Sequence, residues 1–373
     1  MNALTTPSNW QRVRLGDVGK PCMCKRVMKH QTTRYGEIPF YKIGTFGNTA
    51  DAFISKKLFL EYKTKYSFPK KGDILISASG TIGRAVIYDG KPAYFQDSNI
   101  VWIDNDETLV KNDFLFYAYS HVKWNTEHTT ILRLYNDNFK NTLIPLPPLN
   151  EQIAIANILS DVDHYLYSLD ALILKKESVK KALSFELLSQ RKRLKGFNQN
   201  WQRVRLGDIA NYLTSNLSAE QITQQGKIKV YDVNSFIGYT NTTFISDKPY
   251  ISIVKDGSVG RVRILPPKTN ILSTMGALVA NHKTTTEFLF YLLSNFDFKN
   301  FTSGSIIPHI YFKDYKEKAI FLPPLNEQIA IANILSALDS EIISLKNKKR
   351  QFDNIKKALN HDLMSAKIRV LKN

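Results

Sequence analysis

Two stretches of this chain are identical, and they decide its organisation. Leu146–Ser160 reads LPPLNEQIAIANILS, and Leu322–Ser336 reads the same fifteen residues. A second identical pair stands upstream of these boxes: WQRVRLGD occurs at Trp10–Asp17 and again at Trp201–Asp208. The copies lie much further apart than the roughly 20 to 50 residues of a solenoid repeat. The sequence therefore predicts a duplicated module, each copy made of a head, a variable block and a helix.

The blocks between these anchors have diverged, apart from one short motif. Gly80–Arg84 reads GTIGR and Gly257–Arg261 reads GSVGR, each after an apolar run typical of a strand. Glycine permits a tight turn, and the neighbouring Ser or Thr can bond backbone or phosphate groups. An ordinary hairpin turn would explain the glycines equally well, whereas the paired arginines favour nucleic-acid contact. Identical anchors around different interiors indicate one shared frame that carries two different recognition blocks.

A long helix is predicted to start in each box. Pro147 and Pro148 block an earlier helix, Asn150 is a good N-cap, and the basic turn before Gly196 ends the first helix near Lys195. Apolar residues then recur at spacings of three and four, as in a coiled coil. The predicted seam residues are Ile155, Leu159, Val162, Leu166, Leu169 and Ile173 in the first helix, and Ile331, Leu335, Leu338, Ile342 and Leu345 in the second.

Each helix could pack on its own domain alone, but two near-identical seams favour mutual pairing. Antiparallel pairing would relate the modules by a pseudo-twofold axis and leave one block at each end of a rod. Such a layout suits two DNA sites about one helical turn, roughly 34–36 Å or somewhat more, apart. Two different blocks would then read an asymmetric, interrupted target.

The predicted fold class is α+β, with two globular recognition domains separated by two long helices that form an antiparallel coiled coil. The predicted boundaries are 1–147 for the first recognition domain, 148–197 for the first helix, 198–322 for the second domain and 323–373 for the second helix.

Composition favours a folded, DNA-binding protein. The chain has 373 residues, of which 43% are hydrophobic, so it can build a packed core. Its 51 Lys and Arg residues against 33 Asp and Glu residues give a net charge of +18, which favours a polyanionic partner. The two cysteines, Cys22 and Cys24, have no second Cys/His pair near them and are expected to be reduced thiols. No signal peptide and no apolar run near ~18 residues is apparent, so a cytoplasmic location is expected.

No catalytic motif stands out. Gly226-Lys227 is followed by Ile and therefore does not form a Walker A motif, and no cofactor loop follows a strand. The proline pairs lack the polar residue and aromatic of an amino-methyltransferase motif. No nuclease site is apparent, and the seven histidines lack metal-ligand spacing; His121 and His128 are expected to be surface residues. We therefore expect neither a catalytic site nor a metal site in this chain.

The repeated LPPLNEQIAIANILS box, the W-x-x-V-x-L-G-D head and their order resemble the specificity subunits of type I restriction-modification systems. The lead-ins Arg133–Lys140 and Ser303–His309 are similar to that family as well. The resemblance covers nearly the whole chain. It implies a non-catalytic DNA-recognition subunit that holds two adenine-N6 methyltransferase subunits along its helices and is joined by two motor-nuclease subunits. S-adenosylmethionine, ATP and Mg²⁺ would then belong to those partners.

Candidate DNA contacts lie around the recurrent turns and before each helix, because phosphate neutralisation gives affinity and base-edge contacts give specificity. They are Ser79, Thr81, Arg84, Gln96, Ser98, Asn99, Arg133 and Tyr135 in the first block, and Lys255, Ser258, Arg261, Arg263, Ser303 and Ser305 in the second. Each could also be a solvated loop residue.

Two other functions compete with DNA recognition. A fused methyltransferase or nuclease component would need motifs that we do not find, and a methylation assay on the chain alone would identify it. A scaffold that binds only protein through its coiled coil would not require a charge of +18. A transcription factor is also conceivable, but duplicated blocks on long helices differ from a helix-turn-helix layout.

Overall fold

The computed structural model describes residues 9–128 and 132–371, which divide into two compact units. Unit 1 comprises 1–169 and 348–373, and unit 2 comprises 170–347. Each unit therefore holds one variable block, the start of one long helix and the end of the other. The boundaries predicted at 147, 197 and 322 divide the chain differently, because they separate each block from its helix. These boundaries stay a prediction.

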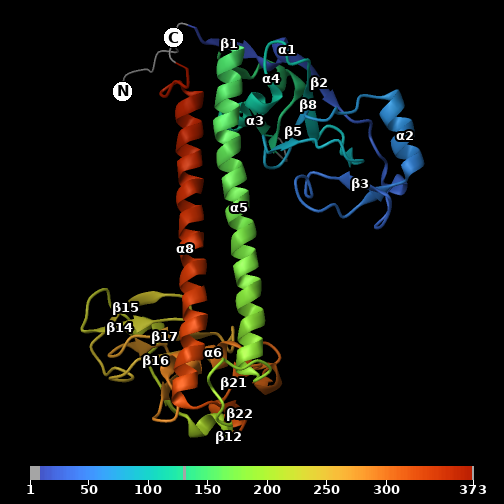
Figure 1. The fold of residues 1–373 in the computed structure, drawn as a ribbon. Helices are drawn as coiled ribbons and strands as arrows, with labels where there is room; N and C mark the ends of the chain where they lie inside the picture. Colours follow the sequence, from blue (N-terminus) through green and yellow to red (C-terminus); the bar gives the residue numbers. More distant parts are fainter. Residues whose placement is uncertain (1–8, 129–131, 372–373) are drawn as a thin grey trace. The chain divides into compact units, whose positions relative to one another are not determined.

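The block of unit 1 mixes strands and short helices, as predicted for an α+β domain (Figure 1). Its sheets have the strand orders β2-β8-β5-β6, β4-β3-β7, β1-β11 and β10-β9. The strands are β1 (Gln11–Arg14), β2 (Gly19–Met23), β3 (Ile38–Tyr41), β4 (Phe53–Ile54), β5 (Ile74–Ser77), β6 (Ala85–Ile87), β7 (Tyr94–Phe95), β8 (Ile100–Asn105), β9 (Glu127–His128), β10 (Leu132–Arg133) and β11 (Leu143–Leu146). The helices are α1 (Leu15–Val18), α2 (Lys56–Lys65), α3 (Asn112–His121) and α4 (Asn136–Asn141).

The block of unit 2 repeats this plan. Its sheets have the orders β13-β19-β16-β17, β15-β14-β18, β12-β22 and β20-β21. The strands are β12 (Gln202–Arg205), β13 (Ala210–Thr214), β14 (Ile228–Tyr231), β15 (Phe236–Thr240), β16 (Tyr250–Val254), β17 (Val262–Leu265), β18 (Asn270–Ile271), β19 (Met275–Ala280), β20 (Thr302–Ser303), β21 (His309–Ile310) and β22 (Ala319–Leu322). The helices are α6 (Thr286–Ser294) and α7 (Phe312–Tyr315).

The apolar strand before each recurrent turn is buried on both faces, which explains its unbroken hydrophobic run. In β5, Ile74 and Ile76 face one core of unit 1, and Leu75 faces the other. In β16, Ile251 and Ile253 face one core of unit 2, whereas Tyr250 and Val254 face the second core. Alternating side chains of one strand thus hold two cores together.

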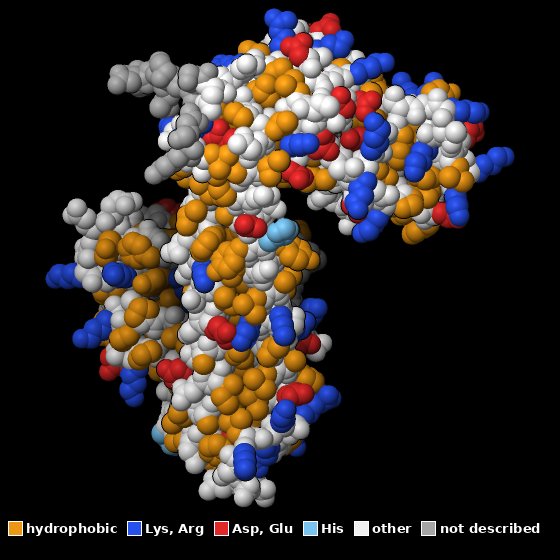
Figure 2. Space-filling view, turned by 45° about the horizontal axis from the view of Figure 1, so that its top comes forward, with side chains coloured by type: hydrophobic (Ala, Val, Ile, Leu, Met, Phe, Trp, Pro, Cys, Tyr) orange, Lys and Arg blue, Asp and Glu red, His pale blue; other side chains and the backbone are white. Residues whose placement is uncertain are grey.

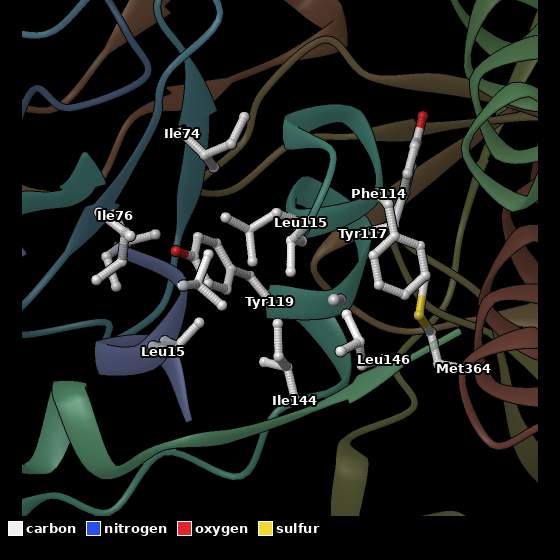
Figure 3. Close-up of a cluster of buried hydrophobic side chains, with 14 of the residues drawn as sticks. Leu15, Ile74, Ile76, Phe114, Leu115, Tyr117, Tyr119, Ile144, Leu146 and Met364 are labelled. Carbon is white, nitrogen blue, oxygen red and sulfur yellow. The ribbon is translucent and has the colours of Figure 1, made fainter. Parts of the chain in front are cut away.

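The larger core of unit 1 joins the block to both long helices. Figure 3 shows Leu15, Ile76 and Tyr119 of the block in one cluster with Met364 from the end of the second long helix. Ile155 and Leu159 belong to the same cluster. The first predicted seam residues therefore pack against the recognition domain as well as along the helix.

The long helices are α5 (Leu149–Leu188) and α8 (Leu325–Met364). The carbonyl of Pro148 accepts hydrogen bonds from the Glu151 and Gln152 N–H groups, so α5 starts before Asn150. The prediction of Asn150 as N-cap is therefore wrong: its Oδ1 instead accepts a bond from the Glu151 N–H at 2.9 Å within the first turn. The predicted end near Lys195 is also wrong, because Gln190 takes a φ of +62° and leaves the helix early.

Within each unit the two helices run antiparallel, as predicted. In unit 1, the Tyr165 and Phe352 rings lie 4.6 Å apart, and Asp163 pairs with Lys356. In unit 2, Lys176 pairs with Glu341 at 2.7 Å, Glu177 with Lys346 at 2.6 Å, and Lys180 with Asp339. The eleven predicted seam residues are all buried or half-buried.

By length and composition alone, α8 could cross a membrane, and it is the one such helix among the described residues. This departs from the expectation that no apolar run approaches a span. The same helix carries the buried Glu327 in an ion pair and packs Ile331 and Leu335 into a core of unit 2. The composition of α8 is therefore weak evidence for a membrane.

Candidate nucleic-acid interface

Hydrogen bonds to Ser77 close the first recurrent turn. The Ser77 N–H donates to the Arg84 carbonyl at 3.0 Å, and the Gly83 N–H donates to the Ser77 carbonyl at 2.9 Å. The Arg84 N–H donates to the Ser77 hydroxyl at 2.9 Å. Gly80 and Gly83 take φ values of +67° and +81°. The turn leaves the predicted contacts Thr81 and Arg84 exposed.

The second recurrent turn has the same geometry. The Val254 N–H donates to the Arg261 carbonyl at 3.0 Å, and the Gly260 N–H donates to the Val254 carbonyl at 2.9 Å. Gly257 and Gly260 take φ values of +82° and +80°. Ser258 and Arg261 are exposed, as are their counterparts in unit 1.

Packing explains the second glycine of each turn without invoking a ligand. A Cβ on Gly83 would lie 2.1 Å from Trp124 Nε1, and a Cβ on Gly260 would lie 2.6 Å from Phe298 Cδ2. By contrast, a Cβ on Gly80 or Gly257 would meet open space. The glycines of the motif therefore follow from turn geometry and aromatic packing, and the arginine is the part available for another role.

An asparagine from another loop contacts each arginine. The Arg84 Nη2 donates to Asn48 Oδ1 at 3.5 Å, and the Arg261 Nη1 donates to Asn234 Oδ1 at 3.2 Å. Asn48 and Asn234 lie in the loops after β3 and β14. The sequence analysis missed both asparagines, because these loops share no motif and their spacing to the turn differs between the copies.

A short strand pairs with each turn and adds a second polar group beside it. In unit 1, Ser79 pairs with Arg133, and the Ser79 hydroxyl donates to Asn99 Oδ1 at 2.7 Å. In unit 2, Asp256 pairs with His309, whose Nδ1 lies 2.7 Å from Asp256 Oδ1. The structure thus brings together Ser79, Asn99 and Arg133, but Ser79 is buried and is therefore not an exposed contact as predicted. The structure also places His309, which the sequence analysis missed, where unit 1 has Arg133.

The other predicted contacts differ in how far they are exposed. Ser98, Arg133, Tyr135, Ser303 and Ser305 are exposed. Lys255 is half-buried at the end of β16, beside the hairpin of β20 and β21.

Two predicted contacts already have partners in the protein. The side-chain carbonyl of Gln96 accepts a bond from the Ile43 N–H at 2.9 Å, which ties two loops together. The Arg263 guanidinium lies 5.4 Å from the centre of the Tyr231 ring and has a buried Nη1. Both side chains therefore contribute to the structure of their block.

A buried carboxylate joins each block to the helices. In unit 1, Glu151 accepts bonds from Trp10 Nε1 at 3.0 Å and from Arg369 Nε at 2.7 Å. In unit 2, Glu327 accepts bonds from Trp201 Nε1 at 3.0 Å and from Arg193 Nη2 at 2.7 Å. The tryptophan is the first residue of the repeated head and the glutamate lies in the repeated box. This contact explains why the two anchors recur together.

A tyrosine provides a second link at the same place in each unit. The Tyr117 hydroxyl donates to Asp163 at 2.8 Å, and the Tyr291 hydroxyl donates to Asp339 at 2.9 Å. Burial is the main cause that raises the pKa of both phenols, and the neighbouring carboxylate adds to it. Lys356 and Lys180 neutralise the two carboxylates. The links are therefore the same in both units, although the blocks differ.

The histidines and cysteines form no metal centre in the part of the chain that the structure describes. His121 is half-buried rather than on the surface, and its ring centre lies 5.3 Å from that of His361. Burial, followed by the nearby His361, lowers the pKa of His121. The side chain of His128 lies outside the described residues. Cys22 and Cys24 are free thiols.

Figure 2 shows Lys and Arg side chains scattered over the visible face, and the whole chain has 51 Lys and Arg residues against 33 Asp and Glu residues. This distribution fits a partner that is recognised over an extended surface, such as a polyanion.

Comparison with known proteins is consistent with the duplicated architecture. The family described as "Type I restriction modification DNA specificity domain" matches residues 7–176 and again residues 198–352. The putative MjaX specificity subunit of a type I restriction enzyme from Methanocaldococcus jannaschii is 30% identical over 341 residues, which cover 80% of this chain and 79% of the relative. A putative type I restriction enzyme specificity subunit from Haemophilus influenzae is 65% identical over 148 residues, but this match spans only 38% of that relative's length and 39% of this chain.

The fold is also similar to a solved structure of known type. The type I restriction-modification S subunit of M. genitalium superposes with a TM-score of 0.65 at 20% identity, and the match covers 97% of this chain and 98% of that one. The two matched regions contain the two recurrent turns and most of both long helices. This chain therefore belongs to the family of type I restriction-modification specificity subunits, and it carries two target-recognition domains.

Proposed function

We propose that this chain reads an asymmetric, bipartite DNA target, with each recognition domain contacting one half-site. The observation that carries this proposal is the paired turn, where one frame presents different side chains. Unit 1 offers Thr81 and Arg133 next to a buried Ser79, and unit 2 offers Ser258 next to the half-buried Asp256 and His309. Both turns end in an exposed arginine, a residue type that bonds phosphates and guanine edges. Two blocks of equal geometry and unequal chemistry suit two different half-sites.

We further propose that the two boxes dock two copies of one partner, the adenine-N6 methyltransferase subunit. Glu151, Gln152 and Ile155 are the same residue types as their counterparts in the second copy. Burial explains this, because these residues hold the block on the helix. It does not account for exposed positions that are also identical. Asn150 and Asn326 bond to the backbone of the first turn, and the remaining positions are Leu149, Ile153 and Asn157 on α5, and Leu325, Ile329 and Asn333 on α8.

The exposed identical positions recur every four residues, so each set lies on one face of its helix. Exposed apolar side chains that are repeated in two diverged copies favour a shared protein partner over solvent. In this proposal the methyltransferase subunits supply S-adenosylmethionine, the motor-nuclease subunits supply ATP and Mg²⁺ binding, and this chain has no catalytic role. Its place of action is the cytoplasm.

The test is a methylome. The chain is expressed with its methyltransferase subunit in a host without DNA methylation, and N6-methyladenine is mapped. The expected result is one interrupted, asymmetric motif that is methylated on both strands. No new methylation by a stable complex of the two proteins would overturn the DNA-reading proposal and favour a protein-binding scaffold.

A control separates recognition from catalysis. The chain expressed alone is expected to give no methylation. Methylation by the chain alone would contradict the non-catalytic role and favour a fused methyltransferase.

A further inference from the structure

A short hairpin in unit 2 carries apolar side chains that no core uses. It consists of β20 and β21, in which Thr302 pairs with Ile310 and Ser303 pairs with His309. The tip residues Ile306 and Ile307 are 91% and 54% exposed. Neither belongs to an apolar core of unit 2. Packing within the described residues therefore gives no reason for two adjacent isoleucines here.

The hairpin is fixed to the second recurrent turn. The Gly257 N–H donates to the Pro308 carbonyl at 2.9 Å, and the Ile310 N–H donates to the Lys255 carbonyl at 2.9 Å. The His309 side chain is paired with Asp256, and Ile310 is buried in the core. These contacts hold the β21 side of the tip beside the turn, and the pairing of β20 with β21 holds the other side. The exposure of the tip is therefore not that of a loose chain end.

The surroundings of the hairpin favour a polyanion. Lys255, Lys313 and Lys316 line an open cavity of about 390 Å³ at the base of the hairpin, together with Tyr311. The exposed Arg261 ends the turn to which the hairpin is tied. An apolar tip flanked by cations suits duplex DNA, whose bases lie between two rows of phosphates.

We propose that Ile306 and Ile307 contact the 5-methyl groups of thymines in the major groove of one half-site. The major groove is wide enough for a two-stranded β-ribbon, and the thymine methyl is the apolar group that base edges present there. The minor groove is narrower and presents no methyl group. This inference rests on the proposed reading of DNA by the chain, and it assigns a specificity role to residues that lack hydrogen-bonding groups.

The test replaces thymine by deoxyuridine, which lacks only the methyl group. The full-length chain, purified with its methyltransferase subunit, is titrated with duplexes in which each thymine of the target is replaced in turn. Every half-site contains a thymine, because the adenine to be methylated is paired with one. For wild type we expect about a 4-fold loss of affinity per contacted methyl group, the value for one buried apolar carbon.

The Ile306→Ser/Ile307→Ser variant should bind the thymine target more weakly than wild type and should no longer distinguish thymine from deoxyuridine. Its salt dependence should be unchanged, because no phosphate contact is lost. Ile343→Ser is the matched control, because Ile343 is an isoleucine of unit 2 with 58% exposure on α8. This control should retain the wild-type preference for thymine.

The outcomes separate the two proposals. If wild type prefers its target to a scrambled duplex but binds deoxyuridine equally well at every position, the thymine contact is overturned and DNA reading stands. Retention of the thymine preference by the double variant overturns it too. If the wild type unstacks a base step and the double variant does not, as detected with 2-aminopurine, the two isoleucines act as a minor-groove wedge instead. If wild type shows no preference for any target, the proposed function itself fails.

Discussion

Replacing Arg193 by Met tests whether the buried ion pair holds the second recognition domain on its helix. The Glu327 side chain is 1% exposed and accepts bonds from Arg193 Nε at 3.2 Å, from Arg193 Nη2 at 2.7 Å and from Trp201 Nε1 at 3.0 Å. In the variant the carboxylate keeps only the indole donor. A buried charge without its partner typically costs 3–5 kcal/mol.

The cost should be somewhat smaller here, because the Arg193 side chain is 25% exposed and water can reach the space that it leaves. We expect the free energy of opening of unit 2 to fall by about 2–4 kcal/mol. At 1.36 kcal/mol for each factor of ten, this corresponds to about 30- to 900-fold faster hydrogen exchange. Amides of α8 near Glu327 report unit 2, and those of α5 near Glu151 report unit 1.

Hydrogen exchange followed by mass spectrometry suits a chain of two units, because a single unfolding curve would mix them. The exchange of unit 1 should not change, since its own pair of Glu151 with Arg369 is intact. Arg193→Met combined with Glu327→Gln should recover most of the loss, because the amide is uncharged and its oxygen still accepts the indole hydrogen bond. Arg205→Met is the surface control: Arg205 is 59% exposed in its pair with Asp208, so little change is expected.

A loss of stability below about 1 kcal/mol in the single variant would refute the reasoning, because a charged, buried Glu327 that has lost its arginine partner should cost more than that. Failure of the double variant to recover would show that Arg193 acts through its packing rather than its charge.

Three other predictions concern a turn glycine, a half-buried histidine and the two turn arginines. Gly83→Ala should destabilise unit 1 by more than Gly80→Ala, as measured by hydrogen exchange of unit 1 amides: both positions have positive φ, but only the first would push a Cβ into an indole. Equal effects would contradict the aromatic packing. His121→Asn should flatten the loss of unit 1 stability between pH 7 and pH 5, measured by hydrogen exchange. Because burial lowers the His121 pKa from 6.5, the unfolded state binds more protons, so stability falls as the pH falls; an unchanged slope would refute this. Arg84→Ala should weaken binding to one half-site by about 1–3 kcal/mol, and Arg261→Ala should weaken binding to the other, in titrations with duplexes altered in one half-site. Unchanged target affinity of a folded Arg84→Ala protein would remove this arginine from the interface.

The sequence alone predicted the duplication, the α+β blocks and the antiparallel helices. These features follow from local signals: identical anchors, proline pairs before a helix, and apolar residues at spacings of three and four. The turns at Gly80 and Gly257 were also predictable, because positive φ at a tight turn demands glycine. The helix ends were predicted less well. Asn150 and Lys195 carry good end signals, but the Pro148 carbonyl and the turn at Gln190 determine the observed limits.

Only the tertiary structure decided which side chains meet across long separations. Nothing local connects Trp10 with Arg369, yet both bond to Glu151, and the matching contacts recur in unit 2. His309 lies beside Asp256 because of a strand pairing that no sequence motif predicts. The sequence therefore determines what each segment forms, because helix and turn signals act between near neighbours. Tertiary packing determines which polar groups meet at the candidate interface, because packing brings together residues that no periodic sequence pattern relates.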